Sequence, residues 1–143
     1  MRKSAFVLSA LLFGASLTTT SAFADNLVGN QAVLRALDKV TATTQDYTVN
    51  VGETLKYGSL EIAVKHCEKR PPEETPETYV FLQISDTRLN GSGEKAENEK
   101  LFSGWMFASS PALSSLEHAV YDIWVIECKV PNVEPMDLDG GEN

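Results

Sequence analysis

The chain has 143 residues, with 20 acidic and 12 basic side chains and a formal net charge of −8 at pH 7. This length corresponds to about one domain, whose core is large enough for it to fold alone. The acidic balance argues against binding to nucleic acid or to an anionic membrane surface, because such binding depends on basic side chains.

The first 24 residues have the order of a secretory signal peptide. A basic start is followed by an apolar run from Ala5 to Leu17 and by a small-x-small triplet that ends at Ala24. The run is shorter than the ~20 residues that a membrane-spanning helix needs. We therefore expect export to the periplasm and a mature chain that begins at Asp25. No cysteine lies at this junction, so we expect no lipid anchor. No later apolar run is long enough to span a bilayer, so we expect no membrane span.

Residues 25–31 are polar, and we expect them to form a leader. Residues 32–40 are ambiguous: apolar side chains four apart suit a short helix, whereas the β-branched residues that follow suit a strand. We favour at most one turn of helix and then a strand to about Thr44.

The clearest β pattern lies between residues 46 and 70. Leu60, Ile62 and Val64 share one face of a strand. The same alternation places His66 inward and Cys67 outward. A buried disulfide at Cys67 then requires a β-bulge, unless it lies on the second face.

The remaining elements follow from turn residues and apolar runs. Three prolines in residues 68–78 predict a loop, and residues 87–100 predict a hairpin tip or a mobile loop. Gly104 marks a bulge or a close backbone approach in the strand that follows. Ser110 and Pro111 suit the cap and first position of a helical turn that places Leu113, Leu116 and Val120 on one side. Strands are expected at residues 79–86, 100–108 and 121–130.

Strands at short intervals with almost no helix predict an all-β domain over residues 32–130. We expect a small β-sandwich or barrel of about six to eight strands, with one short helical turn near residues 110–118. Residues 131–143 are acidic and contain proline and glycine, so we expect a disordered tail.

The two cysteines, Cys67 and Cys128, are expected to form a disulfide, because an even pair in an exported protein usually does. The alternative is a zinc or copper site with His66, Cys67, His118 and Cys128 as ligands. Adjacent residues of a strand face opposite ways, and no pair has the spacing of a structural zinc motif. We therefore favour the disulfide and expect no metal or other cofactor.

Catalytic motifs are absent from the sequence. Ser109, His118 and Asp122 supply the residue types of a hydrolase triad, as almost any chain does. No Gly-x-Ser-x-Gly motif and no Cys-x-x-Cys motif occurs. We expect no catalytic residues and no enzymatic activity.

Large apolar side chains cluster between residues 105 and 111. Trp105, Met106 and Phe107 are consecutive, so they cannot all face one core, and at least one must point the other way. Unless the following turn covers it, such a group forms an exposed patch typical of a binding site. We take Trp105, Met106, Phe107 and Pro111 as the candidate binding surface, with the loop at residues 70–76 beside it. Trp124 shares a face with Ile126 and Cys128, and we expect it in the core.

Three segments, "LRALDKVTATT", "LEIAVKHCEKRPPEETPET" and the stretch from Leu101 to Cys128, resemble the domain of unknown function 2155 family. The resemblance covers about residues 32–129. It implies a small exported protein, mostly found in alphaproteobacteria, with a signal peptide, a single β-rich domain and these two cysteines. It implies no activity, substrate or catalytic residue.

The sequence thus predicts a soluble periplasmic binding or adaptor protein without catalysis. Its partner would be an envelope protein or a ligand. The alternative function is a periplasmic zinc- or copper-binding protein that uses the cysteine and histidine ligands.

Overall fold

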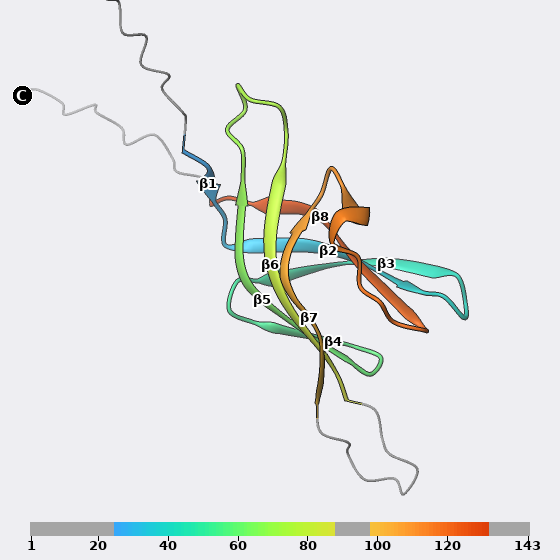
Figure 1. Ribbon diagram of the computed structural model, residues 1–143. Coiled ribbons are helices and arrows are strands. Elements are labelled where there is room, and N and C mark those ends of the chain that lie inside the picture. The colour runs from blue at the N-terminus through green and yellow to red at the C-terminus, as the bar shows by residue number, and fades with distance from the viewer. Residues whose placement is uncertain (1–24, 88–97, 132–143) are drawn as a thin grey trace, which may run out of the picture.

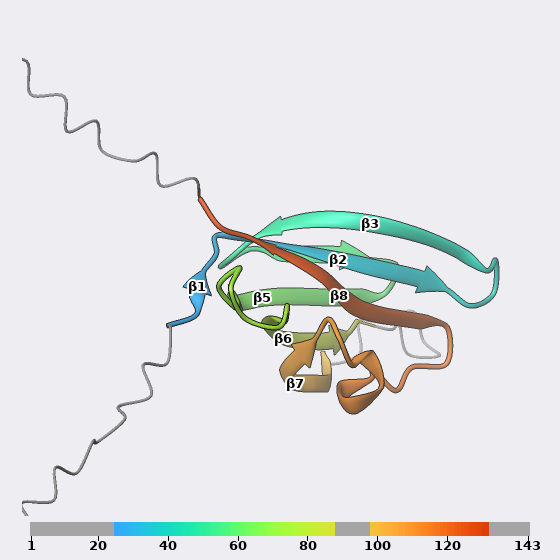
Figure 2. The same cartoon turned by 90° about the horizontal axis from the view of Figure 1, so that it is seen from above.

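The computed structural model describes residues 25–87 and 98–131, which form eight β-strands and one short helix. Two antiparallel sheets lie face to face as two layers (Figures 1 and 2). The five-stranded sheet has the order β1-β5-β6-β7, with β4 also paired to β5, and the three-stranded sheet has the order β3-β2-β8. The bounds are β1 (Leu27–Val28), β2 (Gln31–Asp38), β3 (Thr43–Asn50), β4 (Thr54–Tyr57), β5 (Leu60–Lys69), β6 (Thr78–Asp86), β7 (Glu99–Phe107), the 3-10 helix η1 (Pro111–Ser114) and β8 (Tyr121–Lys129). The predicted all-β fold with one helical turn is therefore confirmed.

The predicted turn of helix at residues 32–40 is wrong, because this segment is strand β2 and the turn that leads to β3. Ala32, Leu34 and Ala36 are buried in alternation, as a strand requires. The inward residues include two small alanines, whereas larger apolar side chains lie on the outer face. That distribution produced the misleading four-residue spacing. A tight turn follows, in which Oδ1 of Asp38 accepts a hydrogen bond from the N–H of Val40 at 2.8 Å.

The five-stranded sheet is built on three consecutive antiparallel strands, β5, β6 and β7. Strand β6 lies between the other two, as its apolar residues on both faces predicted. The expected loop at residues 68–78 joins β5 to β6, and part of the expected leader pairs with β5 as β1. The predicted hairpin tip around Asn90 and Gly91 lies outside the described residues, as do residues 1–24 and 132–143.

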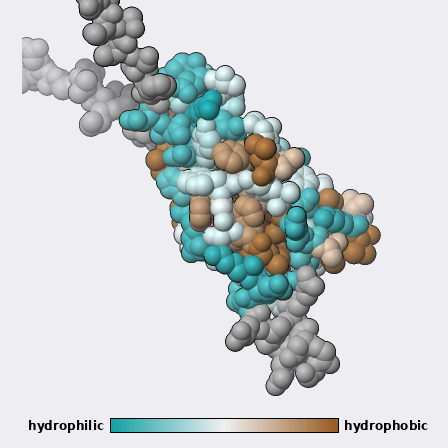
Figure 3. Space-filling view, viewed as in Figure 1, coloured by the Kyte–Doolittle hydropathy of each residue, from teal (hydrophilic) through white to brown (hydrophobic). Residues whose placement is uncertain are grey.

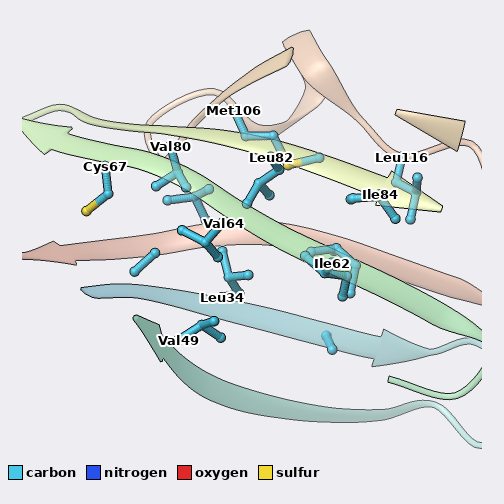
Figure 4. Packing of buried hydrophobic residues seen from close by; sticks show 14 of the residues in the cluster. Leu34, Val49, Ile62, Val64, Cys67, Val80, Leu82, Ile84, Met106 and Leu116 are labelled. Atoms are coloured by element: carbon cyan, nitrogen blue, oxygen red, sulfur yellow. The ribbon is translucent and has the colours of Figure 1, made fainter. Parts of the chain in front are cut away.

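The hydrophobic core fills the space between the two sheets (Figure 4). Both layers contribute alternate residues, and the interior is formed almost wholly by aliphatic side chains. Burial of such side chains is the main favourable term in folding, at about 25 cal/mol per Å² removed from water. The buried apolar residues are Ala32, Leu34, Ala36, Val49, Leu60, Ile62, Val64, Cys67, Val80, Leu82, Ile84, Met106, Leu116, Ile123, Val125 and Cys128.

A disulfide between Cys67 of β5 and Cys128 of β8 joins the two sheets. Both cysteines are fully buried. Each strand carries a β-bulge shortly before its cysteine: the register of β5 shifts between Val64 and His66, and that of β8 shifts around Ile126. A bulge reverses the alternation of the residues after it. It therefore turns each cysteine into the core, and the expectation that His66 points inward is wrong.

Gly29 lies where the chain crosses from the five-stranded sheet to the three-stranded sheet, directly against the disulfide. Its N–H donates to the backbone oxygen of Cys67 at 2.9 Å, and the N–H of Asn30 donates to that of Lys129 at 3.0 Å. A Cβ at this position would overlap Sγ of Cys128. Only glycine fits between the two sheets at this corner.

Gly104 does not mark the irregularity in β7. The register shifts between Ile84 and Ser85, whose partners are Phe102 and Lys100. An added Cβ at Gly104 would meet only the ring of Phe102 at an ordinary 3.5 Å, so no backbone approaches closely there.

The helix η1 begins at Pro111 as predicted, but Ser110 makes no side-chain cap hydrogen bond. The expected shared face is also wrong: Leu116 is buried whereas Leu113 is 76 % exposed. The cause is that the helix ends after one turn, since Ser115 is already extended. No helix within residues 25–87 and 98–131 is long and apolar enough to cross a membrane.

Candidate binding surface

Five aromatic or imidazole side chains lie on the outer face of the five-stranded sheet, opposite the core. The strand register places three of them in one row across β5, β6 and β7 and two in the next row across β6 and β7. We call this group the aromatic patch: His66, Phe81 and Trp105 in the first row, and Tyr79 and Phe107 in the second.

The rings of the aromatic patch hold one another in place by edge-to-face contacts. The ring centre of Trp105 lies 5.4 Å from that of Phe81 and 5.7 Å from that of His66, and Tyr79 and Phe107 lie 5.7 Å apart. Each contact favours a fixed ring orientation. Trp105 remains 39 % exposed. The other four side chains are half-buried, so Trp105 is the most accessible ring of the patch. Figure 3 shows apolar residues among polar ones on the face seen in Figure 1.

Polar side chains border the patch on the side of the loop between β5 and β6. Oε2 of Glu68 lies 3.4 Å from Nε2 of His66, and Nε of Arg70 donates to the hydroxyl of Tyr79 at 2.9 Å. These contacts leave further hydrogen-bonding capacity on the carboxylate and the guanidinium. The loop thus supplies both acceptors and donors at the edge of the rings.

A groove of about 300 Å³ continues the same face beyond the first aromatic row. It exists because Ala63 and Ser85 are small and stand between longer side chains. Oε1 of Glu61 pairs with Nζ of Lys56 at 3.6 Å, and Nδ2 of Asn98 donates to its other oxygen at 3.5 Å. We call this hollow the polar groove; its lining residues are Thr54, Glu61, Ala63, Gln83, Ile84, Ser85 and Lys100.

The predicted binding residues do not form one surface. Trp105 and Phe107 belong to the aromatic patch, but Met106 is 3 % exposed and packs in the core. Pro111 lies in a different hollow, where it lines the same space as Trp124. The expectation that Trp124 packs in the core is also wrong, because the bulge at Ile126 separates its face from that of Cys128.

The loop at residues 70–77 is tied to the start of η1 through Glu77. Burial alone raises the pKa of its carboxyl, but hydrogen bonds from the hydroxyl and N–H of Ser109 and from the N–H of Thr78 outweigh it. The nearby charge of Arg70 acts in the same direction, and the pKa of Glu77 lies below its usual value. The carboxylate therefore fixes this loop beside the patch in its ionised form.

The residues of the alternative metal site are not brought together. The cysteines form the disulfide, and His66 lies on the outer face. His118 contacts Asp86, which pairs with Leu60, about 20 Å along β5 from Cys67. Within residues 25–87 and 98–131, no three His, Cys, Asp or Glu side chains gather to hold a metal ion.

The buried side chain of His118 makes hydrogen bonds at both of its ring nitrogens. Its Nδ1 accepts hydrogen bonds from the N–H groups of Val120 and Tyr121 at 3.1 and 2.9 Å. Its Nε2 lies 3.2 Å from Oδ2 of Asp86, so the proton is on Nε2 and is donated to this carboxylate. The histidine therefore organises the start of β8.

The hypothetical hydrolase triad is not assembled. Ser109 contacts Glu77, His118 contacts Asp86, and Asp122 accepts a hydrogen bond from the N–H of Ile123. These three side chains make no hydrogen bonds to one another among the described contacts.

Sequence reasoning missed three members of the patch, His66, Tyr79 and Phe81. A signal was present for two of them. Tyr79 and Phe81 are two residues apart in an expected central strand, so they share a face. Their inward neighbours are the aliphatic Val80 and Leu82, which marks the aromatic face as the outer one.

Residues 32–128 match the family described as an uncharacterized protein conserved in bacteria, DUF2155. The chain belongs to this family. It is similar to Uncharacterized protein RP359 of Rickettsia prowazekii (strain Madrid E), with 30 % identity over 93 residues, which are 65 % of this chain and 57 % of the relative. The match thus spans little more than half of that relative's length. No solved structure matches the chain significantly.

Proposed function

We propose that this protein is an exported, periplasmic binding protein without catalytic activity, and that the aromatic patch with the polar groove is its binding surface. The observation that carries the proposal is the position of Trp105. It stands on the outer face of a sheet, in contact with two other rings, and keeps 39 % of its surface exposed.

The rings of the aromatic patch lie on the face of the sheet that is turned away from the core. A β-sandwich needs apolar side chains only on the inner face of each sheet, and the outer face is ordinarily polar. Here Phe81 and Trp105 occupy outward positions in two neighbouring strands. Contiguous exposed apolar groups with a polar border commonly mark interaction sites.

Export is supported by the sequence pattern of residues 1–24 and is consistent with the buried disulfide, since such bonds persist in oxidising compartments. Cell fractionation tests it directly. We expect the protein in the periplasmic fraction, with a mature chain that begins at Asp25. Recovery of the uncleaved chain from the cytoplasm would contradict this part of the proposal.

Photo-cross-linking in intact cells tests the binding surface. Trp105 is replaced with p-benzoylphenylalanine in one variant and Trp124 in a matched control, because Trp124 is a half-buried tryptophan on the outer face of the opposite sheet. We expect irradiation to give a defined adduct from position 105 and none from position 124. Equal adducts from both positions, or none from either, would refute the assignment.

A further inference from the structure

We infer that the ligand of this surface is a neutral oligosaccharide; the inference rests on the proposed function and names the class of ligand. The face combines rings at one end with a hydrogen-bonding groove at the other, in one continuous strip along β6. A pyranose ring has apolar C–H faces and a rim of hydroxyl groups, so it matches both halves of the strip.

The hydrogen-bonding groups of the groove favour hydroxyl groups as partners. The carboxylate of Glu61 only accepts, the ammonium of Lys100 only donates, and the amide of Gln83 does both. A ligand that satisfies all three must donate and accept at closely spaced points. Sugar hydroxyls do so at every position of the ring.

The charges around the groove favour a ligand without net charge. Glu61 is paired with Lys56 at 3.6 Å, and Lys100 lines the same hollow. At the aromatic end a carboxylate and a guanidinium are both present, since Glu68 contacts His66 and Arg70 contacts Tyr79. No single sign of charge dominates the strip, although the whole chain carries −8.

The dimensions of the strip favour a chain of several rings. Outward side chains recur every second residue from Ser85 to Tyr79 on β6, which gives a length of about 20 Å. Small side chains at Ala63 and Ser85 leave room in the groove, whereas large rings stand at the other end. An extended oligosaccharide lies along such a strip with one end on the rings.

Two peptide modes fit less well. A peptide that adds a strand pairs with the backbone of an edge strand such as β7, so it lies beside the sheet and does not cover the rings and the groove on its outer face. A proline-rich peptide also docks on aromatic grooves, yet its prolines carry no N–H to donate to Glu61 or Glu68.

Fluorescence and calorimetric titration of the full exported chain test the inference. A Trp124→Phe variant leaves Trp105 as the reporter of the surface. The probes are the β-1,4-linked hexamers of N-acetylglucosamine and of glucose, with a proline-rich peptide and a polyanionic polysaccharide for comparison. We expect a hexamer to shift the emission of Trp105 and to bind more tightly than either comparison probe. Preference for the first hexamer would indicate an acetamido-sugar glycan, and preference for the second a plain glucan.

Three variants locate the binding. Trp105→Ala should weaken hexamer binding by at least about tenfold, which corresponds to the loss of one aromatic contact. Ala63→Arg fills the groove without removing a contact and should weaken it similarly. Trp124→Ala should leave the affinity unchanged. If Trp105→Ala does not fold, the hexamer affinity of Ala63→Arg still shows whether the oligosaccharide binds in the groove.

Failure of this inference is distinguishable from failure of the proposed function. Absence of hexamer binding at millimolar concentration, or equal loss in Trp124→Ala, would overturn the oligosaccharide assignment. If cross-links from position 105 to a protein persist in that case, the surface binds a protein and the proposed function stands. If no cross-link forms either, both are refuted.

Discussion

Replacing Gly29 with alanine should destabilise the protein, because this residue lies directly against the disulfide. The added Cβ would overlap Sγ of Cys128 and lie 2.7 Å from the backbone oxygen of Lys129 and 2.9 Å from Sγ of Cys67. None of these atoms is the end of a flexible side chain. The backbone can escape only by giving up the 2.9 Å hydrogen bond from Gly29 to Cys67 and the pairing of β1 with β5. Each hydrogen bond contributes about 1 kcal/mol net, so we expect a loss of about 2 kcal/mol, within the range of overpacked cores.

Urea unfolding followed by circular dichroism measures this loss. Gly104→Ala is the matched control, because its Cβ would meet only Phe102 at 3.5 Å and should leave stability unchanged or slightly higher. Gly29→Ala should also cost less in a Cys67→Ala/Cys128→Ala background, where two of the three close contacts are gone. An unchanged stability of Gly29→Ala, or an equal loss in both backgrounds, would refute the reasoning.

Three further predictions concern stability. Cys67→Ala/Cys128→Ala should lose about 4 kcal/mol in urea unfolding, because the bond closes a loop with a sequence separation of 61 residues; a loss under about 1 kcal/mol would contradict this entropic account. Glu77→Gln should destabilise the protein at neutral pH, because a carboxyl group whose pKa is lowered by folding stabilises the fold only when it is ionised. The difference in free energy of unfolding between the original protein and the variant should fade as the pH falls below about 4.3 and through the lowered folded-state pKa of Glu77. A difference that persists at pH 2 would exclude this cause. Gly58→Ala should cost more than Gly52→Ala in thermal unfolding: both have positive φ, but only Gly58 would drive a Cβ into a tyrosine ring, whereas Gly52 has open space. Equal losses would mean that the ring moves aside.

Much of the fold follows from the sequence because most strands carry a strong pattern. The alternation from Leu60 to Val64 and the apolar run of β6 give these strands directly. The disulfide follows from the even number of cysteines. The strands need only local patterns and the disulfide needs only the number of cysteines, which explains why these inferences are confirmed.

For residues that follow a β-bulge, the sequence does not predict whether the side chain faces the core or the solvent. The two bulges, near His66 and at Ile126, each reverse the alternation once. Sequence parity therefore placed His66 inside and Trp124 in the core, and both were wrong. With these bulges both cysteines face the core and meet across the sheets, and the pattern of a single strand does not reveal where a bulge lies.

The candidate surface was only half predicted for a similar reason. Trp105 and Phe107 are close in sequence and were recognised together. The polar groove depends on the register of β4, β5, β6 and β7, which brings residues from four strands to one hollow. Pro111 is near Trp105 in sequence, but it packs beside Trp124 instead.

The corner at Gly29 also constrains the order in which the protein folds. Gln31 at the start of β2 pairs with Lys129 at the end of β8, so the two extremes of the domain meet at the same place. Contacts between residues so distant in sequence slow folding, because the chain must close a long loop before they form. The early strands cannot complete their sheet while the chain is still emerging from a ribosome. Folding of this domain is therefore expected to wait for its last strand, and the N-terminal strand closes the structure together with it.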